Sequence, residues 1–97
     1  MSIRVILELH VKPELTEQVK AGFKDLLPDT RTSPGCEGIQ VLQNQTQPDM
    51  LLVLEQWASR EHFDAYLKWR TDRGDIDIIV SFSTTPHQFT FFDYVGA

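Results

Sequence analysis

The sequence predicts an α+β fold in which two main helices cover one face of a four-stranded antiparallel sheet. Three observations support this class. Residues 3–11 alternate apolar and polar side chains with the period of two that is typical of a strand. The apolar side chains of residues 15–27 recur at helical spacing. Turn-forming residues 47–49 then separate two strand-like segments, 38–46 and 50–57, which indicates a hairpin.

The first predicted strand, residues 3–11, has one strongly apolar face. The side chains on that face are Ile3, Val5, Leu7, Leu9 and Val11. Those on the opposite face are Arg4, Ile6, Glu8 and His10. Because successive side chains of a strand point to opposite sides of the sheet, we expect the core to lie against the first of these faces.

The first predicted helix opens at Pro13, where the missing N–H of proline does no harm because the first N–H groups of a helix have no partner. Its core stripe consists of Leu15, Val19, Phe23, Leu26 and Leu27. Gly22 lies on the same stripe, where it would let the helix sit close to the sheet. Pro28 is expected to end or kink the helix. Ser33-Pro34-Gly35 then turns the chain towards the second strand.

The second predicted helix follows the third strand and begins after Ser59, a residue type that commonly caps helices. Its core face carries Phe63, Tyr66 and Leu67. Gly74 ends this helix. The second helix follows directly after the hairpin, so it lies at the junction where Trp57 ends the third strand. We expect a pocket at this junction between sheet and helix.

The last third of the chain contains one ambiguous segment and one clear strand. Residues 75–83 fit the alternation of a strand and also the spacing of a short helix capped by Asp75; the helix is favoured. Residues 87–95 are rich in Phe and Tyr, which is typical of a strand. The resulting order, β-α-β-β-α-(α)-β, is the split βαβ or ferredoxin-like pattern.

The second face of this predicted sheet carries Ile6 and further apolar side chains, and no element of the chain remains to cover it. A bare and partly apolar sheet face is usually an interface. We therefore expect a homodimer in which two sheets pack face to face.

Composition narrows the class of protein. The 97 residues allow one domain, spanning 1–97. The net charge of -5 argues against a nucleic-acid partner. The apolar runs are shorter than the ~20 residues of a membrane span, and the N-terminus does not have the pattern of a signal peptide. The single cysteine, Cys36, excludes an intramolecular disulfide, so a cytoplasmic protein is expected.

Three segments resemble the antibiotic biosynthesis monooxygenase family, the small dimeric α+β barrels. They are Val11-Lys12-Pro13-Glu14, then Pro34-Gly35-Cys36-Glu37-Gly38, and Glu55-Gln56-Trp57 followed by Ser59, Phe63 and Ala65-Tyr66-Leu67. The resemblance covers nearly the whole chain. It implies a dimeric ferredoxin-like barrel with a pocket in each subunit between sheet and helices. Members with known chemistry include cofactor-independent oxygenases of polycyclic phenols, quinol oxidases, haem-degrading enzymes and enzymes that act on signal molecules.

The sequence departs from the residue pattern of the haem-degrading members of this family. Those enzymes use an asparagine on the first strand and a histidine late on the second helix, alongside the tryptophan. Here Leu7 stands in place of the asparagine, and the second helix offers Trp69 and Arg70 but no late histidine. Only Trp57 carries over, so the resemblance does not imply haem degradation.

An oxygenase that works without a cofactor must form an electron-rich phenolate or enolate, which then gives an electron to O₂. It needs a dry aromatic pocket, a base, and donors for the developing anion. The candidate catalytic residues are His62, His87 and Tyr66. The two histidines have the pKa range of a base at neutral pH, and the tyrosine hydroxyl can donate to a substrate oxygen.

The candidate substrate-binding residues are aromatic or apolar side chains near the predicted pocket. They are Trp57, Leu7, Phe23, Phe63, Trp69 and Phe89. Each of them also has a purely structural interpretation, as a core or surface residue. Cys36 has no base paired with it and is expected to be inert. No histidine pair has metal-ligand spacing and no glycine-rich phosphate loop occurs, so no metal and no cofactor are predicted.

The leading hypothesis is a homodimeric monooxygenase or quinol oxidase that acts on a planar aromatic or quinone-like molecule with O₂ and no prosthetic group. Two alternatives stay open. One is a non-catalytic dimeric module that binds a small ligand or is associated with stress, which the weak case for any one histidine favours. The other is a cofactor-free isomerase or lyase of a small carbonyl compound. The sequence leaves open whether residues 75–83 form a lid or a packed wall.

Overall fold

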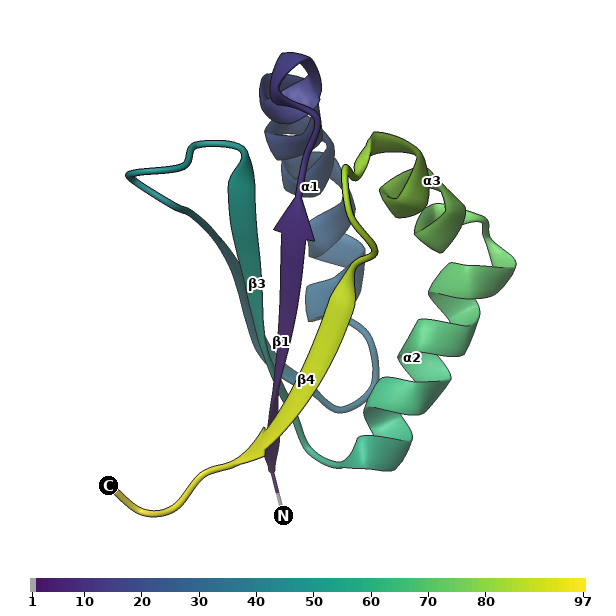
Figure 1. Ribbon diagram of the computed structural model, residues 1–97. Helices are drawn as coiled ribbons and strands as arrows, with labels where there is room; N and C mark the ends of the chain where they lie inside the picture. The colour runs from purple at the N-terminus through teal and green to yellow at the C-terminus, as the bar shows by residue number, and fades with distance from the viewer. Residues whose placement is uncertain (1) are drawn as a thin grey trace.

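The computed structural model describes residues 2–97 and shows a four-stranded sheet with helices on one side (Figure 1). The elements in chain order are β1 (Ile3–His10), the 3-10 helix η1 (Pro13–Leu15), α1 (Thr16–Arg31), β2 (Cys36–Gln43), β3 (Met50–Trp57), α2 (Arg60–Asp72), α3 (Asp75–Phe82) and β4 (Gln88–Asp93). The strand order is β2-β3-β1-β4, and all neighbours pair antiparallel. This confirms the predicted ferredoxin-like α+β fold.

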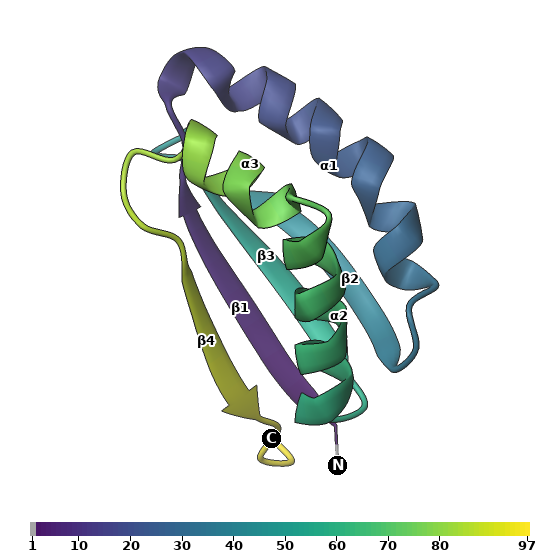
Figure 2. The same cartoon turned by 90° about the vertical axis from the view of Figure 1, so that its right-hand side faces the viewer.

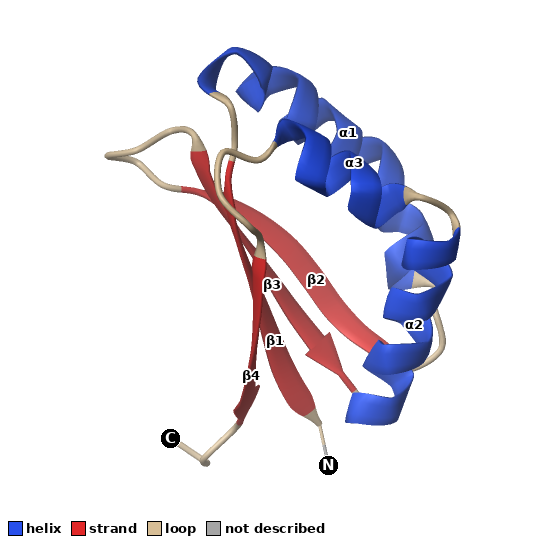
Figure 3. Ribbon diagram, turned by 45° about the vertical axis from the view of Figure 1, so that its right-hand side comes forward, coloured by secondary structure: helices blue, strands red, loops and turns tan. Residues whose placement is uncertain are grey.

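The three α-helices form one layer over the sheet. Figure 2 looks onto this layer, with α1 on one side and α2 and α3 on the other. Within residues 2–97, no helix lies on the opposite face of the sheet, as the side view in Figure 3 shows. The sheet therefore separates a covered inner face, which carries the core, from an uncovered outer face.

The core sits where the inner faces of β1 and β3 meet the helices. Val5, Leu7 and Leu9 are 0%, 4% and 0% exposed. In the pairing of β1 with β3, Leu7 lies opposite Val53 and Leu9 opposite Leu51, and both partners are buried as well. The alternation predicted for the first strand is thus confirmed, because every second side chain of β1 enters the core.

Helix α1 continues through Pro28 to Arg31, so the proline does not end the helix, which is one of the two outcomes expected for it. An interior proline costs a helix about 3 kcal/mol, because one backbone hydrogen bond is lost and the ring clashes with the preceding turn. Tertiary contacts hold this last turn in place: Thr30 is fully buried, and Arg70 of α2 donates to the carbonyl of Leu26 and the hydroxyl of Thr30.

The remaining boundaries are close to those expected. The favoured helix over residues 75–83 is confirmed as α3, and Gly74 in front of it has a φ of 89°, in the left-handed region that glycine tolerates. Ser59 caps α2, since its side chain accepts from the N–H of His62 at 3.2 Å. β2 begins at Cys36 and ends at Gln43, earlier at both ends than predicted.

Candidate functional site

A cavity of about 290 Å³ lies between the inner face of the sheet and all three α-helices. Most of its wall is apolar, formed by Leu7, Leu15, Val19, Phe23, Leu26, Leu27, Ile39, Val53, Phe63, Leu67, Ile76, Ile78, Ile79, Phe82 and Phe89. The volume is at the lower end of the ~300–1,000 Å³ that small-molecule sites occupy. The cavity therefore suits a small, largely apolar ligand.

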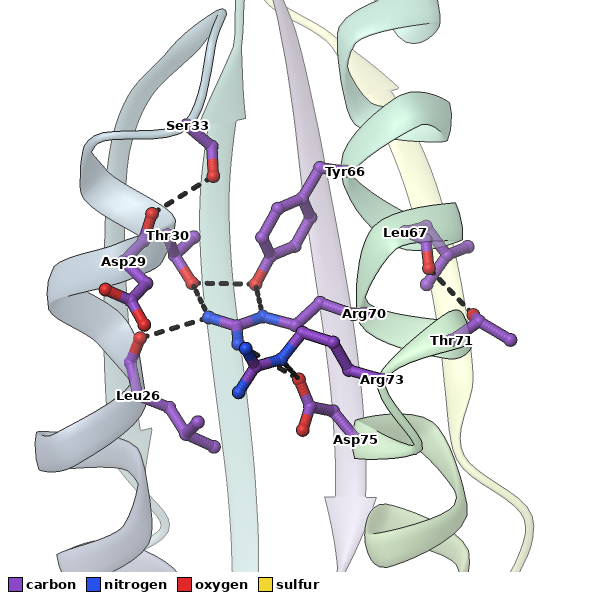
Figure 4. Close-up of polar contacts among 10 residues, drawn as sticks. All are labelled: Leu26, Asp29, Thr30, Ser33, Tyr66, Leu67, Arg70, Thr71, Arg73 and Asp75. Carbon is purple, nitrogen blue, oxygen red and sulfur yellow. Dashed lines mark hydrogen bonds and ion pairs between the residues drawn. The ribbon is translucent and has the colours of Figure 1, made fainter.

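Six polar side chains interrupt this apolar wall, and most belong to one hydrogen-bonded network. They are Gln18, Thr30, Glu55, Tyr66, Arg70 and Asp75. Figure 4 shows how Tyr66 and Arg70 reach from α2 across to Thr30 on α1, with Asp75 at the start of α3 beside them. The network thus joins the three helices at one part of the cavity.

Arg70 is the centre of this network and is only 5% exposed. Its Nε donates to the Tyr66 hydroxyl at 2.8 Å, and its Nη1 donates to the Asp75 carboxylate at 3.0 Å. Its Nη2 donates to the Leu26 carbonyl at 3.0 Å and to Thr30 Oγ1 at 2.9 Å. Burial disfavours the charged guanidinium, yet the contacts with Tyr66 and Asp75 outweigh this cost and raise the pKa of Arg70.

The Tyr66 hydroxyl is held by two neighbours. It lies 2.7 Å from Thr30 Oγ1 and accepts from Arg70 Nε. Burial raises the pKa of Tyr66, although the hydrogen bonds from Thr30 and Arg70 act in the opposite direction. The phenol is therefore protonated at neutral pH and can serve as a donor. Its ring packs on the ring of Trp57 with centroids 4.8 Å apart.

Glu55 is a carboxylate on the inner face of the sheet. It occupies the inward parity of β3 together with Leu51, Val53 and Trp57, and it is 5% exposed. Its Oε1 accepts from the indole N–H of Trp57 at 3.0 Å. Burial raises the pKa of Glu55 to about 7, although the Trp57 hydrogen bond lowers it. A group with this pKa gives and takes protons readily at neutral pH.

Trp57 supports the cavity wall from behind. It is fully buried, and it does not belong to the set of residues that line the cavity. Its indole donates to Glu55, and its ring contacts Tyr66 and the edge of Phe63. Trp57 therefore acts on the cavity only through Glu55, Tyr66 and Phe63, which do line it.

The other candidate residues divide into two groups. Those that line the cavity are Leu7, Phe23, Phe63, Tyr66 and Phe89. His62, His87 and Trp69 do not. Trp69 is 40% exposed at the surface of α2, with the guanidinium carbons of Arg70 and Arg73 at 4.6 and 5.0 Å from its ring centroid.

The two histidines have local partners outside the cavity. His62 is exposed at the start of α2, where its Nδ1 lies 2.7 Å from Ser59 Oγ. Its ring also packs on Gly35 so closely that a Cβ at that position would collide with it, and Gly35 has a φ of 83° that disfavours other residues. His87 packs edge-on against Phe89, and its buried Nδ1 has no hydrogen-bond partner among residues 2–97.

Sequence reasoning missed Glu55, Arg70, Asp75 and Thr30 as site residues. A signal for Glu55 was present, since it is the only charged residue at an inward position of an otherwise apolar strand face, residues 51–57. Arg70 likewise lies seven residues after Phe63, on the core face of α2. A charged side chain on a buried stripe indicates a paired or functional group.

Three further findings concern the reactivity of Cys36, metal binding and membrane-spanning helices. Burial raises the pKa of the Cys36 thiol, which agrees with its expected lack of reactivity. Across residues 2–97, no cluster of three or more His, Cys, Asp or Glu side chains is arranged to hold a metal ion. Within the same residues, every helix is too short or too polar to cross a membrane.

Comparison with known proteins gives a consistent result. The family model described as antibiotic biosynthesis monooxygenase matches residues 2–70. No curated protein matches the chain. Solved structures match at low sequence identity. A conserved protein from Methanosarcina mazei Go1 has a TM-score of 0.86 at 22% identity, over 95% of this chain and 91% of the other.

Two further solved structures are similar. A protein named antibiotic biosynthesis monooxygenase has a TM-score of 0.86 at 22% identity, over 96% of this chain and 98% of the other. A conserved protein of unknown function from Bacteroides thetaiotaomicron, described as a possible oxidoreductase, has a TM-score of 0.82 at 19% identity, over 96% and 97%. At these identities the likeness shows a shared fold.

Proposed function

The chain belongs to the antibiotic biosynthesis monooxygenase family, and from this premise we propose that it is a cofactor-independent monooxygenase or quinol oxidase. Its substrate is a small planar aromatic or quinone-like molecule that reacts with O₂ in the cavity without a prosthetic group. One observation carries the proposal: a single apolar cavity is lined both by Glu55, with a pKa of about 7, and by the hydroxyl of Tyr66.

Glu55 is the proposed base. A carboxylate with a pKa near the working pH accepts a proton and returns it at little cost, which is the property general acid–base catalysis requires. His62 and His87, the bases expected from the sequence, do not line the cavity. We therefore assign the role of base to Glu55, which does line it. The proton comes from a phenol hydroxyl, or from a C–H group next to a carbonyl.

Tyr66 is the proposed donor to the substrate oxygen, on which negative charge develops when the proton leaves. Arg70 fixes its position by donating to the hydroxyl oxygen at 2.8 Å. When Thr30 also donates to that oxygen, the tyrosine proton is free to point at the ligand. A donor held in place before the reaction stabilises the anion without reorganisation.

The anion then reacts with O₂ by transfer of one electron, and the radical pair combines to form a C–O bond. A substrate with a CH₂ group, such as anthrone, loses water from the hydroperoxide and keeps one oxygen atom as a new C=O group. A hydroquinone instead gives two electrons and two protons to O₂, which yields the quinone and hydrogen peroxide. Neither route needs an external reductant, and the apolar wall excludes competing water.

A second candidate function uses the same two groups. Glu55 and Tyr66 also suit the cofactor-free isomerisation of a small carbonyl compound, because that reaction needs one base and one donor to the carbonyl oxygen. The two functions differ in their requirement for O₂. A third possibility, a module that binds its ligand without reaction, would show neither conversion.

We further propose that the chain forms a homodimer through the outer face of the sheet. Ile6 and Leu54 are paired neighbours on that face and are only partly buried. Phe92 of β4, which pairs with Arg4 on the same face, is 47% exposed. An apolar sheet face of this kind is best covered by a second copy of itself. A cytoplasmic location remains a prediction from the single cysteine.

The test is O₂ uptake with anthrone and a panel of hydroquinones, followed together with the absorbance of the product. We expect Glu55→Gln to lower the turnover about 10²–10⁴-fold, because it removes the base but keeps an acceptor for Trp57. Tyr66→Phe should lower it about 10²–10³-fold. Glu8→Gln, on the outer face, is the matched control and should leave turnover unchanged.

Two results would contradict this function. The first is no O₂ uptake above background with any member of the panel. The second is equal turnover by the wild type and Glu55→Gln. Conversion of a carbonyl substrate at the same rate under nitrogen would instead favour the isomerase.

A further inference from the structure

The charged side chains of the cavity wall do not balance one another. Among the described residues 2–97, Arg70 is the only cationic side chain that lines the cavity, whereas Glu55 and Asp75 are both acidic. With both carboxylates ionised, the wall therefore carries an excess of one negative charge. This excess matters because charges act strongly in an apolar, poorly hydrated space.

The one cation is already neutralised by Asp75. The Arg70 Nη1 to Asp75 Oδ2 distance is 3.0 Å, and the two side chains are 6% and 13% exposed. Arg73 also contacts Asp75 at 3.1 Å, but its side chain is 47% exposed and it does not line the cavity. A buried guanidinium paired in this way offers little net charge to a ligand.

Four of the five N–H donors of Arg70 are also committed to the protein. A guanidinium has five N–H donors, and four donations from Arg70 go to Tyr66, Asp75, Leu26 and Thr30. An anionic ligand would lose its hydration in the cavity and find no free counter-ion there. Desolvation without pairing is costly for a charged group.

The position of Asp75 follows from the local backbone. Gly74, with a φ of 89°, turns the chain at the end of α2, and Asp75 is the first residue of α3. This turn brings the start of α3 back against α2, so that a carboxylate five residues after Arg70 reaches its guanidinium. The ion pair is thus built by the short connection between the two helices.

We propose that Asp75 makes the cavity selective for uncharged ligands, so that neutral phenols, hydroquinones and ketones enter and aromatic carboxylates are rejected. This inference rests on the proposed function only in taking the cavity as the ligand site. Removal of the Asp75 charge leaves the buried Arg70 guanidinium without its direct ion-pair partner. The cavity then accepts anionic aromatics, because a carboxylate on the ligand replaces the one that was lost.

The experiment compares two ligands of the same ring size, neutral 2-naphthol and anionic 2-naphthoate, by calorimetry under nitrogen at pH 8. Binding without O₂ separates ligand selectivity from turnover. We expect the wild type to bind 2-naphthol at least about tenfold more tightly than 2-naphthoate. Asp75→Asn keeps an acceptor for both arginines, and it should shift this ratio at least about tenfold towards 2-naphthoate.

Asp72→Asn is the matched control. It also removes one carboxylate from the same region, but Asp72 pairs with Lys68 on the exposed side of α2. It should leave the ratio of the two affinities within about twofold of the wild type. A circular dichroism melting curve of each variant shows that the fold is retained.

Three outcomes would overturn the proposal. One is equal binding of the two ligands by the wild type, which needs no variant. Another is an unchanged ratio in folded Asp75→Asn. The third is no binding of either ligand, which removes the ligand site itself. If no O₂ is consumed but the charge selectivity is observed, the proposed oxygenase chemistry is contradicted and this inference is supported.

Discussion

The two faces of the sheet use the same strands in different ways. Along β1, the inward residues Val5, Leu7 and Leu9 are at most 4% exposed, while Ile6 and Glu8 between them remain partly accessible. The inner face is closed by three helices and encloses the cavity, and the outer face within residues 2–97 has no helix over it. The apolar residues of the outer face are those through which the proposed dimer would form.

The two faces also differ in the environment that each gives to a glutamate side chain. The Glu8 side chain on the outer face is 45% exposed and lies 3.1 Å from His10. Glu55 on the inner face is 5% exposed and accepts from Trp57. Burial raises the pKa of Glu55 to about 7, although the hydrogen bond from Trp57 lowers it.

The largest expected effect is on the inner face, at Arg70. Arg70→Ala removes four donations and leaves the Asp75 carboxylate poorly paired, so we expect the free energy of unfolding to fall by about 3–5 kcal/mol. Lys68→Ala, which breaks the exposed pair with Asp72, should lower the free energy of unfolding far less, because solvent screens an exposed ion pair. Urea unfolding measures both, and equal losses would remove the energetic distinction between the buried and exposed sides of α2.

A smaller effect concerns the pH dependence of stability through Glu55. Its pKa in the folded state, about 7, is above its usual value of 4.5, so the folded protein binds more protons between these pH values than the unfolded chain does. The free energy of unfolding should therefore fall as the pH rises from about 4.5 to above 7, by about 3 kcal/mol in total.

Glu55→Gln removes that titration and should flatten the corresponding part of the stability–pH curve. Urea unfolding at several pH values from about 4 to about 8 is the measurement, because this range brackets the shift from 4.5 to about 7. A wild-type curve that rises with pH across this window would show that Glu55 does not have the raised pKa.

The smallest effect on folding is expected on the outer face, at Ile6. Ile6→Asp should change the free energy of unfolding of the isolated chain by less than about 1 kcal/mol, because the side chain is only partly buried. It should abolish the proposed dimer, because two copies of the new charge would meet in an apolar interface. Light scattering gives the mass, and a wild type with the mass of the 11.2 kDa monomer at micromolar concentration would contradict the dimer.

Much of the fold was predictable because its signals are local. The alternation of residues 3–11, the turn at 47–49 and the glycine at position 74 each fix one element or junction. The continuation of α1 through Pro28 was not predictable from these signals. The end of α1 accepts a hydrogen bond from Arg70, which is 44 residues away from its acceptor Leu26 in the sequence.

The candidate site was predictable in its apolar part and at Tyr66, but not in its charged residues. Phe23 and Phe63 follow helical spacing, and the cavity has them on its wall. Glu55 was missed as a base because its free side chain has a pKa far below neutral, whereas histidine is near neutral without help. Burial, which the sequence does not display directly, gives the carboxylate that property. The partners of Arg70 are likewise spread over three helices.

The hydrogen bond from Trp57 to Glu55 gives the protein an internal optical reporter. The indole N–H is bonded to a group that changes charge near neutral pH, so the emission of Trp57 should follow the proton on Glu55. The chain has two tryptophans, and Trp69 at the surface can be replaced by phenylalanine to leave one fluorophore. A library of unlabelled compounds can then be screened by fluorescence alone, before any product of the reaction is known.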